Sequence, residues 1–385
     1  MKQSRIFLCL LLACLFAMPA KEQADTKETE IIEAILAQLS PYERVCQLFI
    51  VKPESIISAK HVTQAGTATR NAMGKYPVGG FIYFSSNVTG EKQITAMIDT
   101  VQEISRENTG VGLFIGVDEE GGTITRVSKK LPMTKFDTMA EIGARGDTQE
   151  AYALGSTLAG ELTPLGFNID FAPVADVLIL QKNTEIGDRS FGRDAQRVAE
   201  MVAAETRGLT EGGILACLKH FPGMGSAVSN SHLGMSTSSR TLGELRETEF
   251  LPFAAGIDAG ARMVMVSHVT YTAVDPDSPA SLSKTFVTEL LRGELGFDGL
   301  IITDALRMQA IADHYASGVA AVCAVEAGAD LLLMPADAPA AMEGLYEAVQ
   351  NGQISQERID ESVRRILACK LEMGLIDTDT EGESK

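Results

Sequence analysis

The sequence predicts an α/β protein built as a single (β/α)8 barrel of the TIM type, and two observations carry this prediction. First, eight short apolar runs alternate with longer stretches of helical periodicity. Second, 385 residues with 45% hydrophobic content can bury one large core, and no Pro- or Ser-rich linker divides the chain. The strands of a parallel barrel are covered on both faces, so they appear as continuous apolar runs. A doubly wound open sheet is the alternative fold.

The predicted strands and helices follow one another along most of the chain. The apolar runs are 45–51, 78–84, 112–117, 168–172, 215–218, 263–266, 300–302 and 331–334. The stretches with helical period and propensity are 91–106, 149–165, 194–209, 241–259, 284–295, 317–327, 336–350 and 355–373. Eight alternations over roughly 330 residues are the count expected of a barrel.

The first twenty residues have the layout of a secretory signal. Lys2 and Arg5 precede an apolar stretch, 6–18, that is too short for a comfortable membrane span. The segment Leu11-Leu12-Ala13-Cys14 also resembles a bacterial lipoprotein box, in which Cys14 would carry the lipid. We therefore expect a bacterial protein that is exported and is either periplasmic or anchored to a membrane. The predicted parts are a signal at 1–20, an exposed N-terminal segment at 21–34, the barrel at 35–373 and an acidic tail at 374–385.

The charge and the cysteine pattern exclude several classes of function. The formal net charge is −18 and no basic stripe appears, which argues against a nucleic-acid partner. Such a chain favours neutral or cationic small ligands. No CxxC or Cys/His spacing indicates a metal site, so we expect neither a metal nor an organic cofactor. The sequence does not indicate an oligomeric state.

Polar residues stand at the carboxyl ends of several predicted strands. Asp118 ends the third run, Lys219 and His220 end the fifth, and Asp304 ends the seventh. In a barrel these ends open onto one face, where the active site lies, so the four side chains should converge. His268, after the sixth run, is given no catalytic role.

Two glycine-rich segments add cations to the same face. The segment 116–126, GVDEEGGTITR, has a Gly-Gly turn that lets Arg126 fold back toward Asp118. It lacks the GxGxxG spacing of a dinucleotide site, so a Rossmann interpretation is rejected. The segment 186–194, IGDRSFGRD, places Arg189 in the loop after the fourth strand.

Four segments together carry a family resemblance. They are VDEEGG with Arg126, GDRSFG, LKHFPGMG followed by SNSH, and GFDGLIITDALRM. In order and spacing they resemble glycoside hydrolase family 3 β-N-acetylhexosaminidases of the NagZ type, over residues 35 to 373. The resemblance implies a barrel enzyme that removes terminal β-linked N-acetylglucosamine with retention of configuration, from peptidoglycan fragments or related glycans. Its partner would be a small saccharide containing N-acetylglucosamine.

The resemblance also implies a role for each matching residue. Asp304 matches the nucleophile that forms a glycosyl-enzyme ester. His232 matches an acid/base carried on a loop, where an imidazole with a pKa near neutrality can give and take the proton. The positions that grip the sugar are Asp118, Arg126, Arg189, Lys219 and His220.

Two positions depart from the family pattern. Asn230 stands where the family places an Asp that partners the acid/base imidazole, and Met224 stands where a His is usual. An amide can orient an imidazole but stabilises its protonated form poorly. Two alternatives therefore stay open: a catalytically impaired saccharide-binding homologue, and a β-glycoside phosphorylase, in which a neutral partner would repel incoming phosphate less.

Overall fold

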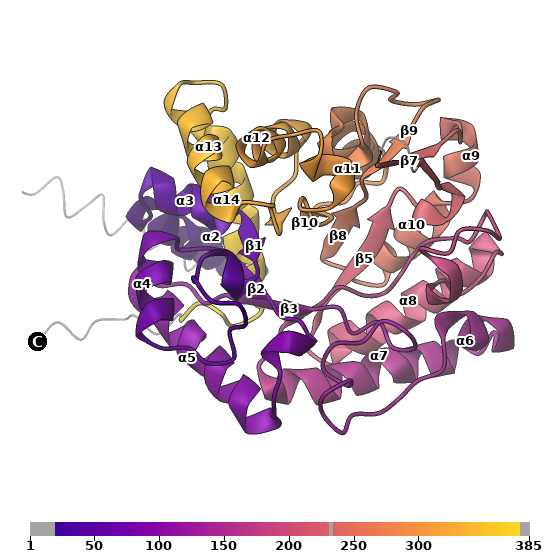
Figure 1. Ribbon diagram of the computed structural model, residues 1–385, viewed down its shortest axis with the longest axis horizontal. Coiled ribbons are helices and arrows are strands. Elements are labelled where there is room, and N and C mark those ends of the chain that lie inside the picture. Colours follow the sequence, from indigo (N-terminus) through magenta and orange to yellow (C-terminus); the bar gives the residue numbers. More distant parts are fainter. Residues whose placement is uncertain (1–19, 231–233, 378–385) are drawn as a thin grey trace, which may run out of the picture.

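The computed structural model describes residues 20–230 and 234–377. Eight parallel strands form its centre, in the order β10-β8-β5-β4-β3-β2-β1-β11 (Figure 1). Every residue of β3, β8 and β10 is buried, as their unbroken apolar sequence predicts. Each predicted run overlaps one strand: β1 Phe49–Val51, β2 Gly80–Ile82, β3 Phe114–Val117, β4 Ile169–Asp170, β5 Leu215–Phe221, β8 Met263–Val266, β10 Leu300–Thr303 and β11 Leu332–Leu333.

The two ends of the sheet meet, which closes the barrel. Ile302 and Leu331 form a parallel bridge between β10 and the start of β11. The amide of Thr303 donates to the Leu331 carbonyl at 3.1 Å, and the amide of Leu331 donates to the Ile301 carbonyl at 3.0 Å. Since β1 pairs with both β2 and β11, the ring is continuous. The (β/α)8 prediction is confirmed, and the open-sheet alternative is wrong.

Strand β5 is the one whose pairing bears most on the site. It pairs with β8 from Cys217 opposite Met263, and the register shifts between Lys219 and Phe221. Side chains alternate in a regular strand, so this irregularity breaks the alternation where the polar residues begin. The peptide bond between Lys219 and His220 is cis.

Helices surround the strands (Figure 1). Their starts follow from the sequence: the side chains of Asp147, Asp194, Asp337 and Ser355 each accept a hydrogen bond from a first-turn amide. The predicted stretches correspond to α5 Glu91–Thr109, α7 Thr148–Leu162, α8 Ala195–Glu211, a π-helix Thr285–Glu294, α12 Ser317–Ala327, α13 Ala338–Gln350 and α14 Gln356–Glu372. The structure adds α2 Ala20–Gln38, α3 Pro41–Gln47, α4 Thr67–Lys75, α6 Met139–Arg145 and α11 Gln309–Ala312.

Two boundaries differ from the prediction. The first half of the run 45–51 belongs to α3, because Ser40 and Glu43 form a reciprocal capping box and Pro41 occupies the first helical position. The stretch 241–259 is two helices, α9 Leu242–Glu247 and α10 Phe250–Asp258. Pro252 in the first turn of α10 cannot donate a hydrogen bond back into α9, so the chain breaks at Thr248.

A small sheet that the sequence analysis did not predict lies on the carboxyl side of the barrel. It contains β6 Val228–Asn230, β7 Met235–Ser238 and β9 Val269–Tyr271, with β6 antiparallel to β7 and β7 parallel to β9. The first two strands follow β5 and the third follows β8, so the sheet stands above the ends of those barrel strands.

The chain on either side of the barrel is also structured within the described range. Residues 21–34 lie in α2, whose Ile31, Ile32 and Ile35 pack against the core. Leu375 and Ile376, at the start of the predicted tail, are buried. The proposed signal up to residue 19, Cys14, His232 and residues 378–385 fall outside the described residues. Within the described part of the chain, every helix is too short or too polar to traverse a lipid bilayer.

Candidate active site

The carboxyl ends of the barrel strands enclose a cavity of about 230 Å³. Six of the eight predicted site residues line it together: Asp118, Arg126, Arg189, Lys219, His220 and Asp304. Met224, Met308 and Met334 supply apolar wall. The predicted convergence is thus observed for the four strand-end residues and for the two loop arginines, whereas Asn230 lies in β6 and His232 is outside the described residues.

A buried lysine stands at the centre of the charged groups. Lys219 Nζ lies 2.9 Å from Asp118 Oδ1 and 2.6 Å from Glu120 Oε1, and its side chain is 2% exposed. Burial alone would lower the pKa of this amine, but the two carboxylates raise it above its ordinary value. Lys219 is therefore a fixed cation in the cavity.

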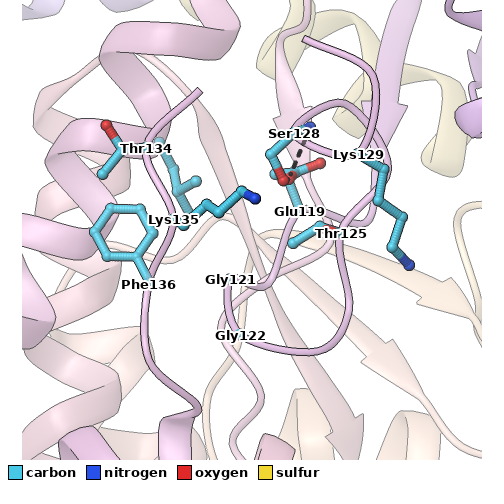
Figure 2. A pocket seen from close by; sticks show the side chains of 10 residues that line it. Glu119, Gly121, Gly122, Thr125, Ser128, Lys129, Thr134, Lys135 and Phe136 are labelled. Atoms are coloured by element: carbon cyan, nitrogen blue, oxygen red, sulfur yellow. Dashed lines mark hydrogen bonds between the residues drawn. The ribbon is translucent and has the colours of Figure 1, made fainter. Parts of the chain in front are cut away.

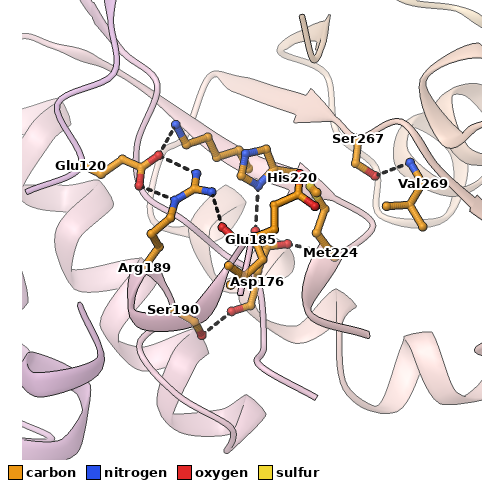
Figure 3. A network of polar contacts seen from close by, with 12 residues as sticks. Glu120, Asp176, Glu185, Arg189, Ser190, His220, Met224, Ser267 and Val269 are labelled. Carbon is orange, nitrogen blue, oxygen red and sulfur yellow. Dashed lines mark hydrogen bonds and ion pairs between the residues drawn. The ribbon is translucent and has the colours of Figure 1, made fainter. Parts of the chain in front are cut away.

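Glu120 pairs both with Lys219 and with Arg189, and Figure 3 shows Glu120 facing Arg189. Arg189 donates from Nε to Glu120 Oε2 at 2.8 Å and from Nη2 to Oε1 at 2.7 Å. Burial would raise the pKa of Glu120, yet Lys219 and Arg189 lower it to about 2. The sequence analysis missed Glu120; the signal was the second acid of DEEGG, which sequence alone does not distinguish from a turn residue.

A loop held by Glu119 carries Arg126. The Glu119 carboxylate accepts from the amides of Arg126 and Val127, each at 2.7 Å, and from the Ser128 hydroxyl at 2.5 Å. Arg126 in turn places Nη2 3.7 Å from Asp118 Oδ2. Figure 2 shows the outer side of this loop, where Glu119, Ser128 and the Gly121-Gly122 turn border a separate pocket of about 410 Å³. Glu119 thereby fixes where Arg126 enters the site.

Asp176 positions His220, as Figure 3 shows. Asp176 Oδ2 lies 2.7 Å from His220 Nδ1, while Oδ1 accepts from the Met224 amide at 2.5 Å. Because Nδ1 is engaged, Nε2 is the ring nitrogen of His220 that remains for a ligand. Asp176 lies six residues beyond β4 in irregular chain, so no strand-end pattern indicated it.

Asp304 lies directly after β10. Its amide donates to the Val266 carbonyl at 2.9 Å, and its Oδ1 accepts from the Ala305 amide at 2.7 Å. Enclosure by the protein raises the pKa of this carboxyl, but His220 and His268 outweigh that effect and the pKa lies below its ordinary value. The side chain is therefore an anion at neutral pH, as a carboxylate nucleophile must be.

His268 supports this segment from behind. Its Nε2 lies 3.1 Å from the Ala305 carbonyl and its Nδ1 lies 2.7 Å from Ser281 Oγ. Burial lowers the pKa of His268. Through these two contacts His268 holds the chain next to Asp304 in position.

Comparison with known proteins gives a consistent result. The family model described as the glycosyl hydrolase family 3 N terminal domain matches residues 42–369. A beta-hexosaminidase of Chromobacterium violaceum is 36% identical over 277 residues, which cover 70% of this chain and 75% of that protein. Beta-hexosaminidase A of Pseudoalteromonas piscicida is 32% identical over 326 residues, covering 78% of this chain; the match spans only 54% of that relative's length.

A solved structure agrees with the sequence matches. The glycoside hydrolase family 3 beta-N-acetylglucosaminidase from Paenibacillus sp. str. FPU-7 superposes with a TM-score of 0.82 at 36% identity, covering 90% of this chain and 65% of that one. The family match extends over most of the barrel and includes every strand-end residue of the cavity. The chain therefore belongs to glycosyl hydrolase family 3.

Proposed function

We propose that this protein is an exo-acting, retaining β-N-acetylglucosaminidase that removes terminal β-linked N-acetylglucosamine from peptidoglycan fragments or related glycans. The observation that carries the proposal is Asp304, a carboxylate at the end of β10 that lines a cavity in which Lys219 is paired with Asp118 and Glu120. Relatives named beta-hexosaminidase and beta-N-acetylglucosaminidase support the substrate class.

In the proposed first step, an Asp304 oxygen attacks the anomeric carbon and forms an ester while the bond to the leaving oxygen breaks. The imidazolium of His232 gives its proton to that oxygen. In the second step, water attacks the same carbon, its proton passes to His232 and the Asp304 carboxylate is released. Two displacements return the original configuration.

The proposed role of the paired charges is to hold the sugar. Asp118 accepts from hydroxyl groups, and Arg126, Arg189 and Lys219 donate to them. The Nε2 atom of His220 donates or accepts, depending on its protonation. Their ion pairs and hydrogen bonds keep these groups in place before the substrate enters. A preorganised cavity of this kind supplies much of a rate enhancement by positioning.

Asn230 supports one competing function. If the amide leaves His232 without an effective proton, the protein becomes a saccharide-binding homologue with the cavity intact. The mechanism with a functional His232 is preferred because Asp304 lines the cavity together with all five residues proposed to hold the sugar.

The test is hydrolysis of 4-nitrophenyl β-N-acetylglucosaminide by the purified mature protein, with and without inorganic phosphate. Phosphate-independent turnover that disappears in Asp304→Ala supports the hydrolase. Turnover that requires phosphate would assign a phosphorylase, and a folded protein without turnover in either condition would assign the binding homologue.

Export completes the proposal, with residues 1–20 as the cleaved signal or Cys14 as a lipidated residue. Mass spectrometry of the protein from its native cell checks this. A mature chain starting after Ala20 supports a free periplasmic enzyme, a diacylglyceryl group on Cys14 supports a membrane-anchored one, and an intact Met1 contradicts export.

A further inference from the structure

A second cavity adjoins the catalytic one. It has a volume of about 620 Å³ and is lined by segments that follow β1 and β10 and by the start of α13. Met334 lines both cavities. Lys52 also connects them, because its Nζ lies 4.9 Å from the centroid of the Phe84 ring, which lines the catalytic cavity. The second cavity thus begins at the wall of the first.

Two cations face this cavity with their hydrogen-bond donors available. They are Lys52 and Arg307, and neither forms an ion pair within residues 20–230 and 234–377. The Arg307 amide donates to the Met334 carbonyl at 2.9 Å, which ties the Arg307 backbone to the segment that lines both cavities.

The carboxylates that line the cavity are engaged elsewhere. Glu54 Oε1 accepts from the Val62 amide at 2.9 Å and from Asn87 Nδ2 at 2.7 Å, while its Oε2 is buried and has no hydrogen-bond partner among the described residues. Asp337 Oδ1 accepts from the Ala340 amide at 3.0 Å as the N-cap of α13. The positive end of this 13-residue helix borders the same cavity. The groups left to meet a ligand are therefore mainly donors.

We propose that Lys52 and Arg307 form an oxyanion subsite that receives a carboxylate or phosphate on the leaving-group side of the substrate. This inference rests on the proposed function. An exo-acting enzyme holds one sugar beside Asp304, so the rest of the substrate extends outside that cavity. A guanidinium fork and an ammonium group together suit a planar carboxylate or a phosphate. The subsite makes the enzyme selective for a charged aglycone.

The test uses two disaccharides that differ in one group: N-acetylglucosamine β-1,4-linked to glucuronic acid, and the same sugar β-1,4-linked to glucose. We expect the wild-type protein to favour the acidic disaccharide in kcat/KM by about tenfold, the size of one charge-assisted hydrogen bond. In Lys52→Met and in Arg307→Gln this ratio should fall to about one to three. Lys182→Met is the matched control, since Lys182 borders a different pocket beside the cavity, and there the ratio should stay unchanged.

Adding inorganic phosphate distinguishes an anion carried by the aglycone from a free anion in solution. If phosphate inhibits hydrolysis of the acidic disaccharide but not of the neutral one, and this inhibition is lost in Arg307→Gln, a free anion enters the same subsite. If phosphate does not inhibit, the anion must be carried by the aglycone. Equal kcat/KM values for the two disaccharides in the wild type, or equal losses on both in the variants, would overturn the subsite.

Calorimetry measures binding to the subsite independently of hydrolysis. Both disaccharides are titrated into Asp304→Ala, which does not turn them over. Tighter binding of the acidic disaccharide, in a protein whose wild type hydrolyses no nitrophenyl substrate, would keep the subsite and reject the proposed hydrolase. Equal binding together with normal hydrolysis would reject the subsite alone.

Discussion

Lys219 Nζ lies 2.6 Å from Glu120 Oε1, and both side chains are 2% exposed. Each of these buried charges is stabilised by the other, and removing one leaves an unpaired charge buried in the protein, which is strongly destabilising. We expect Glu120→Gln to reduce the free energy of unfolding by about 3 kcal/mol. It should also lower kcat/KM at least tenfold, because Lys219 and Arg189 lose their common anchor.

Urea denaturation and steady-state kinetics check this prediction. Glu294→Gln is the matched control, since Glu294 pairs with Arg246 on the surface, where the two side chains are 34% and 50% exposed. Its cost should stay below about 1 kcal/mol. A similar loss of unfolding free energy in both variants would show that the buried Glu120 pair contributes no more to stability than the exposed Glu294 pair.

The acid limit of activity should lie below the ordinary range of an aspartate. The pKa of Asp304 is lowered, so its carboxylate stays ionised as the pH falls through about 4, where a free aspartate would gain a proton. With a nitrophenyl substrate, whose leaving group needs little acid help, kcat/KM should remain level down to that pH. A loss of activity centred above pH 5 in a protein that stays folded would contradict the lowered pKa.

His232→Ala should separate substrates by leaving group. A sugar leaving group needs a proton as the bond breaks, whereas nitrophenolate does not, so kcat/KM should fall far more for a disaccharide than for the nitrophenyl glycoside. Kinetics on the two substrates give the ratio. Equal losses on both would rule out a proton-transfer role for His232.

Asn230→Asp should increase turnover of disaccharides. A carboxylate at this position would stabilise the imidazolium of His232, which an amide cannot do. We expect kcat on poor leaving groups to rise and the nitrophenyl rate to change little. The same kcat for both proteins on a disaccharide would mean that another group already serves the imidazole.

Lys370 should make the folded barrel less stable as the pH falls. It is fully buried, its Nζ donates to Gln47 Oε1 at 3.0 Å, and burial lowers its pKa to about 7. An unfolded lysine titrates near 10.4, so between about pH 7 and 10 the unfolded chain binds more protons and this group makes stability rise with pH. Lys370→Met should flatten that rise and stabilise the protein at pH 7, by up to about 1.4 kcal/mol for each unit of the shift.

Thermal denaturation at several pH values checks this expectation. Lys92→Met, on an exposed position of α5, should leave the pH dependence unchanged. An unaltered pH profile in Lys370→Met would show that the buried amine does not titrate in this range.

Much of the barrel could be predicted because each strand is buried on both faces and leaves a continuous apolar run, as in β8 and β10. Four cavity residues followed from the rule that such strands open onto one face, and Arg126 and Arg189 followed from the glycine-rich segments beside those ends. Glu120 and Asp176 could not be found this way, since their importance depends on partners far along the chain, Lys219 and His220. The break between α9 and α10 was missed because both halves share helical periodicity. Pro252 interrupts the helix only because it lacks a backbone N–H, which leaves no mark on the hydrophobic pattern.

The irregular pairing of β5 with β8 restricts insertions and deletions in this part of the chain. Beyond Lys219 the two strands are out of step, and two adjacent residues, Lys219 and His220, both line the cavity. A loop at the mouth of a barrel ordinarily accepts added or lost residues. Here one residue gained or lost between Leu218 and Phe221 would rotate either the cation or the imidazole out of the cavity. The length of this stretch is therefore fixed.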